Sequence, residues 1–129
     1  MNKLIVLFNH ALTEEQRRDA EKNLSVKSVV LPPQELSVLW ADVPPYLEGL
    51  SDWLTPFKEW LSRVSSSGDY VLVQGDYGAT WLMVNYAFEL NLIPVYATTR
   101  REAKEVEVGD GVVEMRRRFA HVQFRRYGV

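Results

Sequence analysis

The chain has 129 residues, of which 47% are hydrophobic, and it carries 15 Lys and Arg against 17 Asp and Glu. This balance is typical of a globular domain and excludes a disordered tail, and the absence of cysteine excludes a disulfide framework or a thiolate metal site. The length predicts a single domain over residues 1–129. The apolar run at residues 4–8 is too short for a signal peptide or a membrane span, so we expect a cytoplasmic protein with no membrane partner.

Charge is unevenly distributed along the chain. Residues 1–97 contain 7 basic and 12 acidic side chains, whereas residues 98–129 contain 8 basic and 5 acidic ones. Positive charge is therefore concentrated in the last quarter of the sequence. We expect no long nucleic acid as a partner, because the chain as a whole is not basic.

The chain begins with a strand pattern and then a helix pattern. Residues 4–8 form a continuous β-favouring run, which is typical of a strand covered on both faces. Thr13 and Gln16 have the spacing of a capping box, so a helix is predicted over residues 14–24.

The same alternation continues through the middle of the chain. Residues 29–31 predict a second strand, and apolar residues at helical spacing between positions 47 and 64 predict a long amphipathic helix. A third strand is predicted over residues 70–73, followed by a helix over residues 79–90.

The last part of the chain has a different pattern. A fourth strand is predicted at residues 93–97, a hairpin around residues 109–111, and a final strand at residues 122–124. Strands that alternate with helices indicate a parallel sheet with right-handed crossovers. We therefore expect an α/β, Rossmann-like, three-layer domain with strand order 2-1-3-4 and a C-terminal antiparallel hairpin or strand.

This topology predicts where a ligand binds. In open α/β sheets, ligands bind beyond the carboxyl ends of the strands at the point where the strand order reverses, here between strands one and three. The candidate site residues come from three segments. They are Asn9 and His10 after strand one, Gln74, Gly75, Asp76, Gly78, Ala79 and Thr80 after strand three, and Thr98, Thr99, Arg100 and Arg101 after strand four.

The turn at residues 74–80 is predicted to hold a nucleotide. Its glycines allow close backbone approach, and the free amides of a helix N-terminus favour an anion. No lysine follows the turn, so it is not a Walker loop. Asp76 either caps the helix or accepts hydrogen bonds from a ribose or a base, and the sequence leaves both interpretations open.

Two side chains are candidates for chemistry. His10 can exchange a proton near neutral pH, although a histidine after a strand can equally be a loop residue. Arg100 can bind phosphate through two parallel hydrogen bonds, although single arginines are usually solvated. His121 is interpreted as structural and without a partner, and the arginines at positions 116–118 and 125–126 as mostly solvated.

The predicted helix over residues 79–90 is apolar nearly all round, which predicts that a second subunit covers it. Burial of this helix against its copy would place two sites around one ligand in a two-fold dimer. Tyr86→Glu, on the side of the helix expected to be exposed, should then weaken the dimer.

Segments 8–13, 71–80, 94–100 and 121–125 together resemble the small stand-alone ring nucleases of type III CRISPR systems. These are relatives of the CRISPR-associated Rossmann-fold (CARF) sensor domains. The resemblance implies a homodimer that binds a cyclic oligoadenylate, the tetraadenylate in particular. It also implies cleavage of the ring without a metal or cofactor, which switches off the antiviral response.

Three hypotheses are compatible with these residues. In a metal-independent ring nuclease, a ribose 2′-hydroxyl attacks the adjacent phosphate, His10 assists proton transfer and Arg100 stabilises the phosphate, while the threonines and the turn position the ring. A binding module would sequester the same ligand without cutting it. A metal-dependent nuclease is suggested by Asp76 with the Glu102-Ala103-Lys104 triplet.

Overall fold

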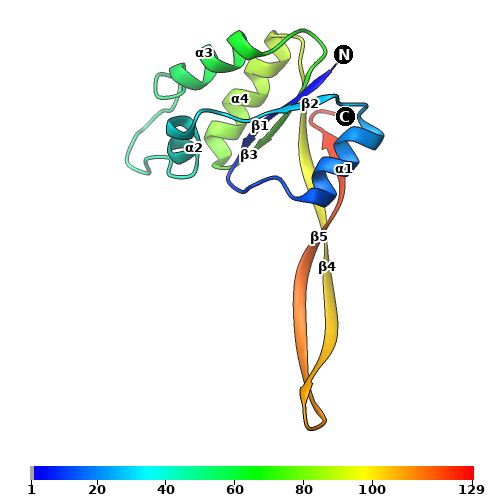
Figure 1. Ribbon diagram of the computed structural model, residues 1–129. Coiled ribbons are helices and arrows are strands. Elements are labelled where there is room, and N and C mark those ends of the chain that lie inside the picture. The colour runs from blue at the N-terminus through cyan, green and yellow to red at the C-terminus, as the bar shows by residue number, and fades with distance from the viewer. Residues whose placement is uncertain (1) are drawn as a thin grey trace.

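Residues 2–129, which the computed structural model describes, fold into helices and strands arranged as Figure 1 shows. Their bounds are β1 Lys3–Phe8, α1 Glu14–Asn23, β2 Ser28–Val30, α2 Gln34–Trp40, α3 Thr55–Val64, β3 Tyr70–Gln74, α4 Tyr77–Glu89, β4 Ile93–Gly109 and β5 Val112–Arg126. No helix within the described residues is long and apolar enough to cross a membrane.

The strands form one mixed sheet in the order β2-β1-β3-β4-β5. β1 pairs in parallel with β2 on one side and β3 on the other, β3 pairs in parallel with β4, and β5 is antiparallel to β4. These pairings confirm the α/β class, the predicted order of the first four strands and the C-terminal antiparallel strand.

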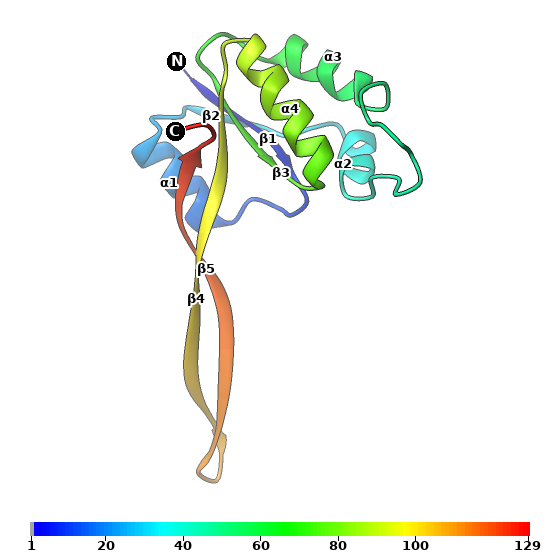
Figure 2. The same ribbon diagram turned by 180° about the vertical axis from the view of Figure 1, so that it is seen from behind.

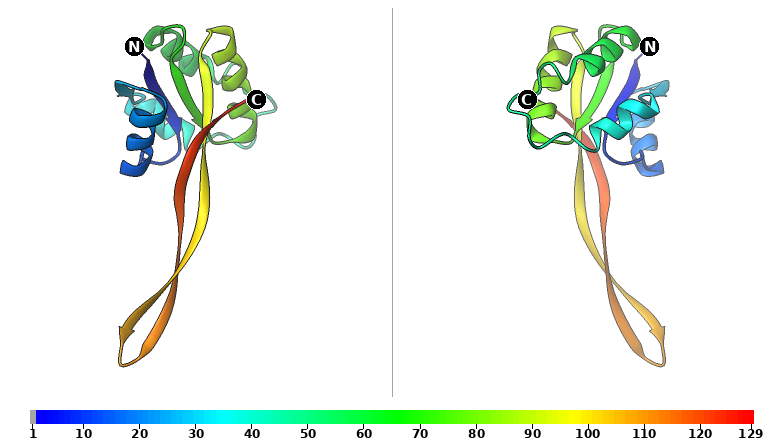
Figure 3. Two further views of the ribbon diagram at one scale, coloured as in Figure 1. Left: turned by 90° about the vertical axis from the view of Figure 1, so that its right-hand side faces the viewer. Right: turned by 90° about the vertical axis from the view of Figure 1, so that its left-hand side faces the viewer.

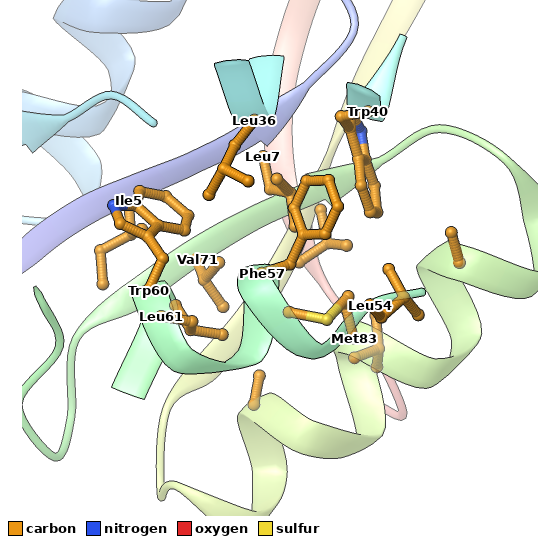
Figure 4. Packing of buried hydrophobic residues seen from close by; sticks show 14 of the residues in the cluster. Ile5, Leu7, Leu36, Trp40, Leu54, Phe57, Trp60, Leu61, Val71 and Met83 are labelled. Carbon is orange, nitrogen blue, oxygen red and sulfur yellow. The ribbon is translucent and has the colours of Figure 1, made fainter. Parts of the chain in front are cut away.

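Helices cover both faces of the sheet. Alternate residues of β1 point to opposite faces, so Ile5 and Leu7 pack under α2, α3 and α4, whereas Leu4 and Val6 pack with Ala20 of α1. Figure 3 shows α1 and α4 on opposite sides of the strands. On the face covered by α2, α3 and α4, Phe57 points towards Leu7 and Trp40 (Figure 4). The ring centroids of Phe57 and Trp40 lie 5.6 Å apart.

The prediction of one long helix over residues 47–64 is wrong. α3 begins at Thr55, and residues 51–54 form turns. Pro56 accounts for this start, because a proline inside a longer helix would clash with the carbonyl group four residues earlier, whereas proline fits the first helical turn. α2 was not predicted at all, although it contributes the buried side chains Leu36 and Trp40.

Strand four does not end at residue 97 as predicted. β4 continues to Gly109, and β5 pairs with it from the turn back to Arg126, so the predicted hairpin and final strand are one continuous ribbon. Asp110 and Gly111 turn the chain with positive φ angles of 46° and 77°. β4 pairs with β3 only as far as Val95, beyond which the ribbon projects away from the body as an arm (Figures 1 and 2).

A buried carboxylate joins the beginnings of β1 and β3. Asp69 is 1% exposed, and its Oδ2 atom lies 2.8 Å from Lys3 Nζ. The backbone N–H groups of Lys3 and Ser66 donate to the same carboxylate at 3.0 and 2.8 Å. Burial opposes ionisation, but the hydrogen bonds and charge of Lys3 and the amide of Ser66 outweigh it and hold the pKa of Asp69 below its usual value.

Asp69→Asn should therefore destabilise the protein by roughly 1–3 kcal/mol at neutral pH, because buried donors lose a charged acceptor. Because the folded-state pKa is lowered, this stabilisation is present above the unfolded-state pKa of about 3.9 and is lost as pH falls through the folded-state value. Urea unfolding of both proteins between neutral pH and pH 3 measures it. Asp52→Asn, at an exposed carboxylate, is the control, and an equal pH dependence for Asp69→Asn and the wild type would contradict the assignment.

Candidate functional site

The carboxyl ends of β1 and β3 lie side by side. Phe8 is in register with Gln74, so the segments that begin at Asn9 and Gly75 leave the sheet together. A Cβ atom added to Gly75 would lie 3.0 Å from Asn9 Oδ1, which shows how closely the two segments approach. The reversal of strand order therefore lies where the sequence predicts it.

Trp40 packs against this meeting point from α2. Its indole N–H donates a 2.9 Å hydrogen bond to the carbonyl oxygen of Gln74. A Cβ atom on Gly75 would be only 2.7 Å from Trp40 Nε1, so the turn requires glycine for steric reasons. Sequence reasoning missed Trp40 because a seven-residue helix after two prolines has too little periodicity to be recognised.

Two polar side chains of the predicted turn hold backbone groups. Asp76 Oδ2 accepts from the Ala79 amide at 3.0 Å, so Asp76 is the N-cap of α4. Gln74 Oε1 accepts from the Ala97 amide at 2.7 Å and joins β3 to β4 where their ladder ends. Of the two interpretations of Asp76, helix capping is the one for which the structure contains a contact.

Two pockets flank the meeting point. The first, of about 550 Å³, lies between the end of β1, α1 and α2, and the second, of about 370 Å³, lies beside β3 and α4. The lining of the first includes Phe8, Asn9, His10, Leu12, Arg17 and Gln34. The lining of the second is Gln74, Gly75, Tyr77, Thr80, Trp81, Val84 and Tyr127.

The predicted site residues are thus divided between the two pockets and the first turn of α4. Asn9 and His10 line the first pocket, whereas Gln74, Gly75 and Thr80 line the second. Gly78 is exposed and Ala79 is buried in the first turn of α4. The hydroxyl of Thr80 is buried and has no hydrogen-bond partner among residues 2–129.

The third predicted segment does not form a turn. Thr98, Thr99, Arg100 and Arg101 lie inside β4 at the base of the arm, and they line neither pocket. Thr98 exchanges hydrogen bonds with the backbone of β5 at 3.1 and 3.2 Å, and the Arg101 guanidinium lies 5.4 Å from the Phe119 ring centroid. What is wrong is the prediction that strand four ends before these residues, because pairing with β5 extends the strand to Gly109.

Arg17 is a candidate residue that sequence reasoning missed. It is half-buried on α1 and lines the same pocket as His10, so one basic side chain and one histidine border this pocket. The capping box at Thr13 could have suggested Arg17 as a candidate. The capping box defines the start of the helix, and Arg17 follows one turn later.

His121, which was predicted to be structural and without a partner, has a partner. Its Nε2 atom lies 2.7 Å from Asp19 Oδ2, and the two side chains are only 5% and 13% exposed. This contact ties β5 to α1. The two residues are 102 positions apart, so no sequence spacing could have paired them.

The exposed side of α4 differs from the prediction. Tyr86 is half-buried against the core, with Lys58 Nζ 5.8 Å from its ring centroid. Tyr77, Trp81 and Phe88 are the exposed aromatic residues, at 95%, 66% and 47% exposure, and we call them the α4 face. A substitution that tests an interface on this helix must therefore be made on the α4 face and not at Tyr86.

Comparison with known proteins gives a family but no activity. The model of a family described as "Uncharacterized protein MJ1673 family" matches residues 2–125. A protein of Methanocaldococcus jannaschii named "Uncharacterized protein MJ1673" is 46% identical over 127 residues, which cover 98% of both chains. No solved structure matches the chain.

Gly75→Ala should destabilise the protein by roughly 1–3 kcal/mol, because the added methyl group overlaps the Trp40 ring. Gly49→Ala is the matched control, since nothing lies within 4 Å of a Cβ atom at Gly49. The cost should be smaller in a Trp40→Phe background, and thermal unfolding of the four proteins of this double-mutant cycle measures the coupling. An equal cost in both backgrounds would show that Trp40 is not the reason for the glycine.

Proposed function

The chain belongs to the MJ1673 family, and we propose that it is a metal-independent ring nuclease that binds and cleaves a cyclic oligoadenylate, the tetraadenylate in particular. In this proposal the body is a Rossmann-like domain of the CRISPR-associated type, and cleavage switches off type III CRISPR signalling in the cytoplasm. The main support is the meeting of the Asn9-His10 and Gly75-Asp76 segments at the reversal of strand order, with a pocket on either side.

The pocket beside α4 suits an adenine base. Tyr77, Trp81 and Tyr127 supply aromatic rings in its lining, and stacking of a base on an aromatic ring contributes about 1–3 kcal/mol. Gln74 and Thr80 are the polar side chains of the same lining. The amides of Tyr77 and Gly78 stand in the first turn of α4, where backbone N–H groups have no helical acceptor and favour a phosphate.

The pocket beside α1 suits the reaction. A ribose 2′-oxygen attacks the adjacent phosphorus, the bond from phosphorus to the 5′-oxygen breaks, and the products are a 2′,3′-cyclic phosphate and a 5′-hydroxyl. His10 transfers the proton that moves between these oxygens. Arg17 in the same pocket stabilises the charge on the phosphate, and Arg100 and Arg101 at the arm base bind neighbouring phosphates of the ring.

A two-fold dimer completes the proposed site. A cyclic tetranucleotide can adopt two-fold symmetry, and a symmetric dimer presents each patch twice about its axis. The α4 face begins at the carboxyl edge of the sheet and exposes Tyr77, Trp81 and Phe88, which is the composition expected of a buried interface. Contact between two α4 faces would bring two Gly75 turns around one ring.

His10→Ala should lower the rate of ring cleavage by roughly 10²–10⁴-fold and leave ligand affinity nearly unchanged. Single-turnover cleavage of cyclic tetraadenylate in EDTA, followed by chromatography, measures the rate. Gln34→Ala, at another residue of the same pocket, is the control. Full turnover by His10→Ala would contradict the role of His10, and a wild type that binds the ring without cutting it would support the binding module instead.

Phe88→Glu should weaken dimerisation and cleavage together, because it places a charge in the proposed interface without touching either pocket lining. Titration of the wild type should give one ring per two chains. Tyr46→Glu, at an aromatic residue that is 84% exposed and far from α4 in sequence, is the control. One ring bound per chain, with full activity in Phe88→Glu, would contradict the composite site.

A further inference from the structure

The arm formed by the outer parts of β4 and β5 has a segregated charge pattern. We call residues 105–114 the tip, and residues 100–104 with 115–119 the shaft. The tip contains four acidic residues and no basic one, whereas the shaft contains six basic residues and one acidic one. The arm therefore has a negative end and a positive middle.

Most of these charges form no ion pair with another part of the described chain. Of the basic residues of the shaft, only Arg118 forms an ion pair among residues 2–129, with Glu102 and Glu15. Lys104 and Arg116 lie directly opposite each other across the ribbon, and like charges in this position are destabilising. An acidic surface from outside the chain would relieve this repulsion.

Apolar side chains accompany both sets of charges. In the tip, Val106 faces Glu114 and Val113 faces Glu107, and at the boundary with the shaft Met115 faces Glu105. In the shaft, Ala103 faces Arg117 and Phe119 faces Arg101. Val113, Met115 and Phe119 are 56%, 52% and 67% exposed, so the pairs that contain them offer one apolar and one charged group to a partner.

The arm also lacks the support that a ribbon of this length needs. A two-stranded hairpin is marginally stable by itself in water, and its outer edges present unpaired backbone groups. Beyond Val95, β4 pairs with no strand except β5 among residues 2–129. A second surface packed against the arm would stabilise the ribbon and cover its outer edges.

We propose that the arm packs antiparallel against the arm of a second copy of this chain. A two-fold axis across the arms would set each acidic tip against the basic shaft of the other copy, and every favourable contact would occur twice. Parallel arms would instead set tip against tip and shaft against shaft, which is repulsive. A nucleic acid fits less well, because the four acidic residues of the tip would repel its phosphates.

This contact is separate from the α4 face and does not depend on ring cleavage. The twelve residues from Thr98 to Gly109 span about 40 Å at roughly 3.3 Å per residue, so antiparallel arms hold the two carboxyl edges apart. The arm contact therefore cannot be the contact that encloses one cyclic ligand between the carboxyl edges of two subunits. The arms are thus a second association surface, which joins two dimers formed through α4 faces.

Charge reversal tests the arm contact. One variant reverses the tip with Glu105→Lys, Glu107→Lys and Glu114→Lys, and the other reverses the shaft with Lys104→Glu, Arg116→Glu and Arg117→Glu. All six side chains are exposed, so the fold should persist, which circular dichroism checks. Each variant alone should associate at least about tenfold more weakly than the wild type in sedimentation velocity at low salt, because each reversed charge acts twice.

An equimolar mixture of the two variants should restore the mass of the wild-type assembly, because each positive tip then meets a negative shaft. A chain that carries all six substitutions should likewise regain it. Wild-type mass in both single variants, or a mixture that stays dissociated, would overturn the proposal. Loss of association in the shaft variant alone, or loss of oligonucleotide binding by that variant at unchanged mass, would also overturn it and place another partner on the shaft.

Discussion

The burial of β1 is the constraint on which the rest of the structure depends. This strand is covered on both faces and hydrogen-bonded along both edges, to β2 and to β3. Parallel pairing on both edges satisfies its backbone groups, and parallel neighbours require the chain to return through crossover segments, which here contain helices on the sheet faces. The reversal of strand order beside β1, and hence the meeting of Asn9 with Gly75, follows from that requirement.

The second organising feature is the departure of β4 from the sheet. β4 follows β3 as far as Val95, and the Gln74 side chain bonds to Ala97 at the next position where a ladder bond would lie. From there β4 depends on β5, whose base is tied to the body by His121 and Asp19. The candidate site and the arm thus share one strand, and the orientation of the arm base is set by groups next to the site.

These two features give the molecule two separate surfaces, and our two proposals assign a different kind of contact to each. The carboxyl edge, with its pockets, aromatic rings and guanidinium, suits a small anionic ligand that contains bases. The arm, with its segregated charges and paired apolar residues, suits an extended and self-complementary partner. β4 runs from one surface to the other, and Arg100 and Arg101 lie at the junction.

The sequence by itself determined the α/β class, the order of the first four strands and the capping box at Thr13 and Gln16, because these depend on local periodicity and on short-range hydrogen bonds. It also identified Asn9 and Gly75, since the ends of parallel strands follow from strand order. Only the tertiary structure decided the positions of Trp40, Arg17 and His121, and the placement of Thr98 and Arg100 inside a long strand. Those positions depend on contacts between residues far apart in the chain, for which neither periodicity nor spacing leaves a signal.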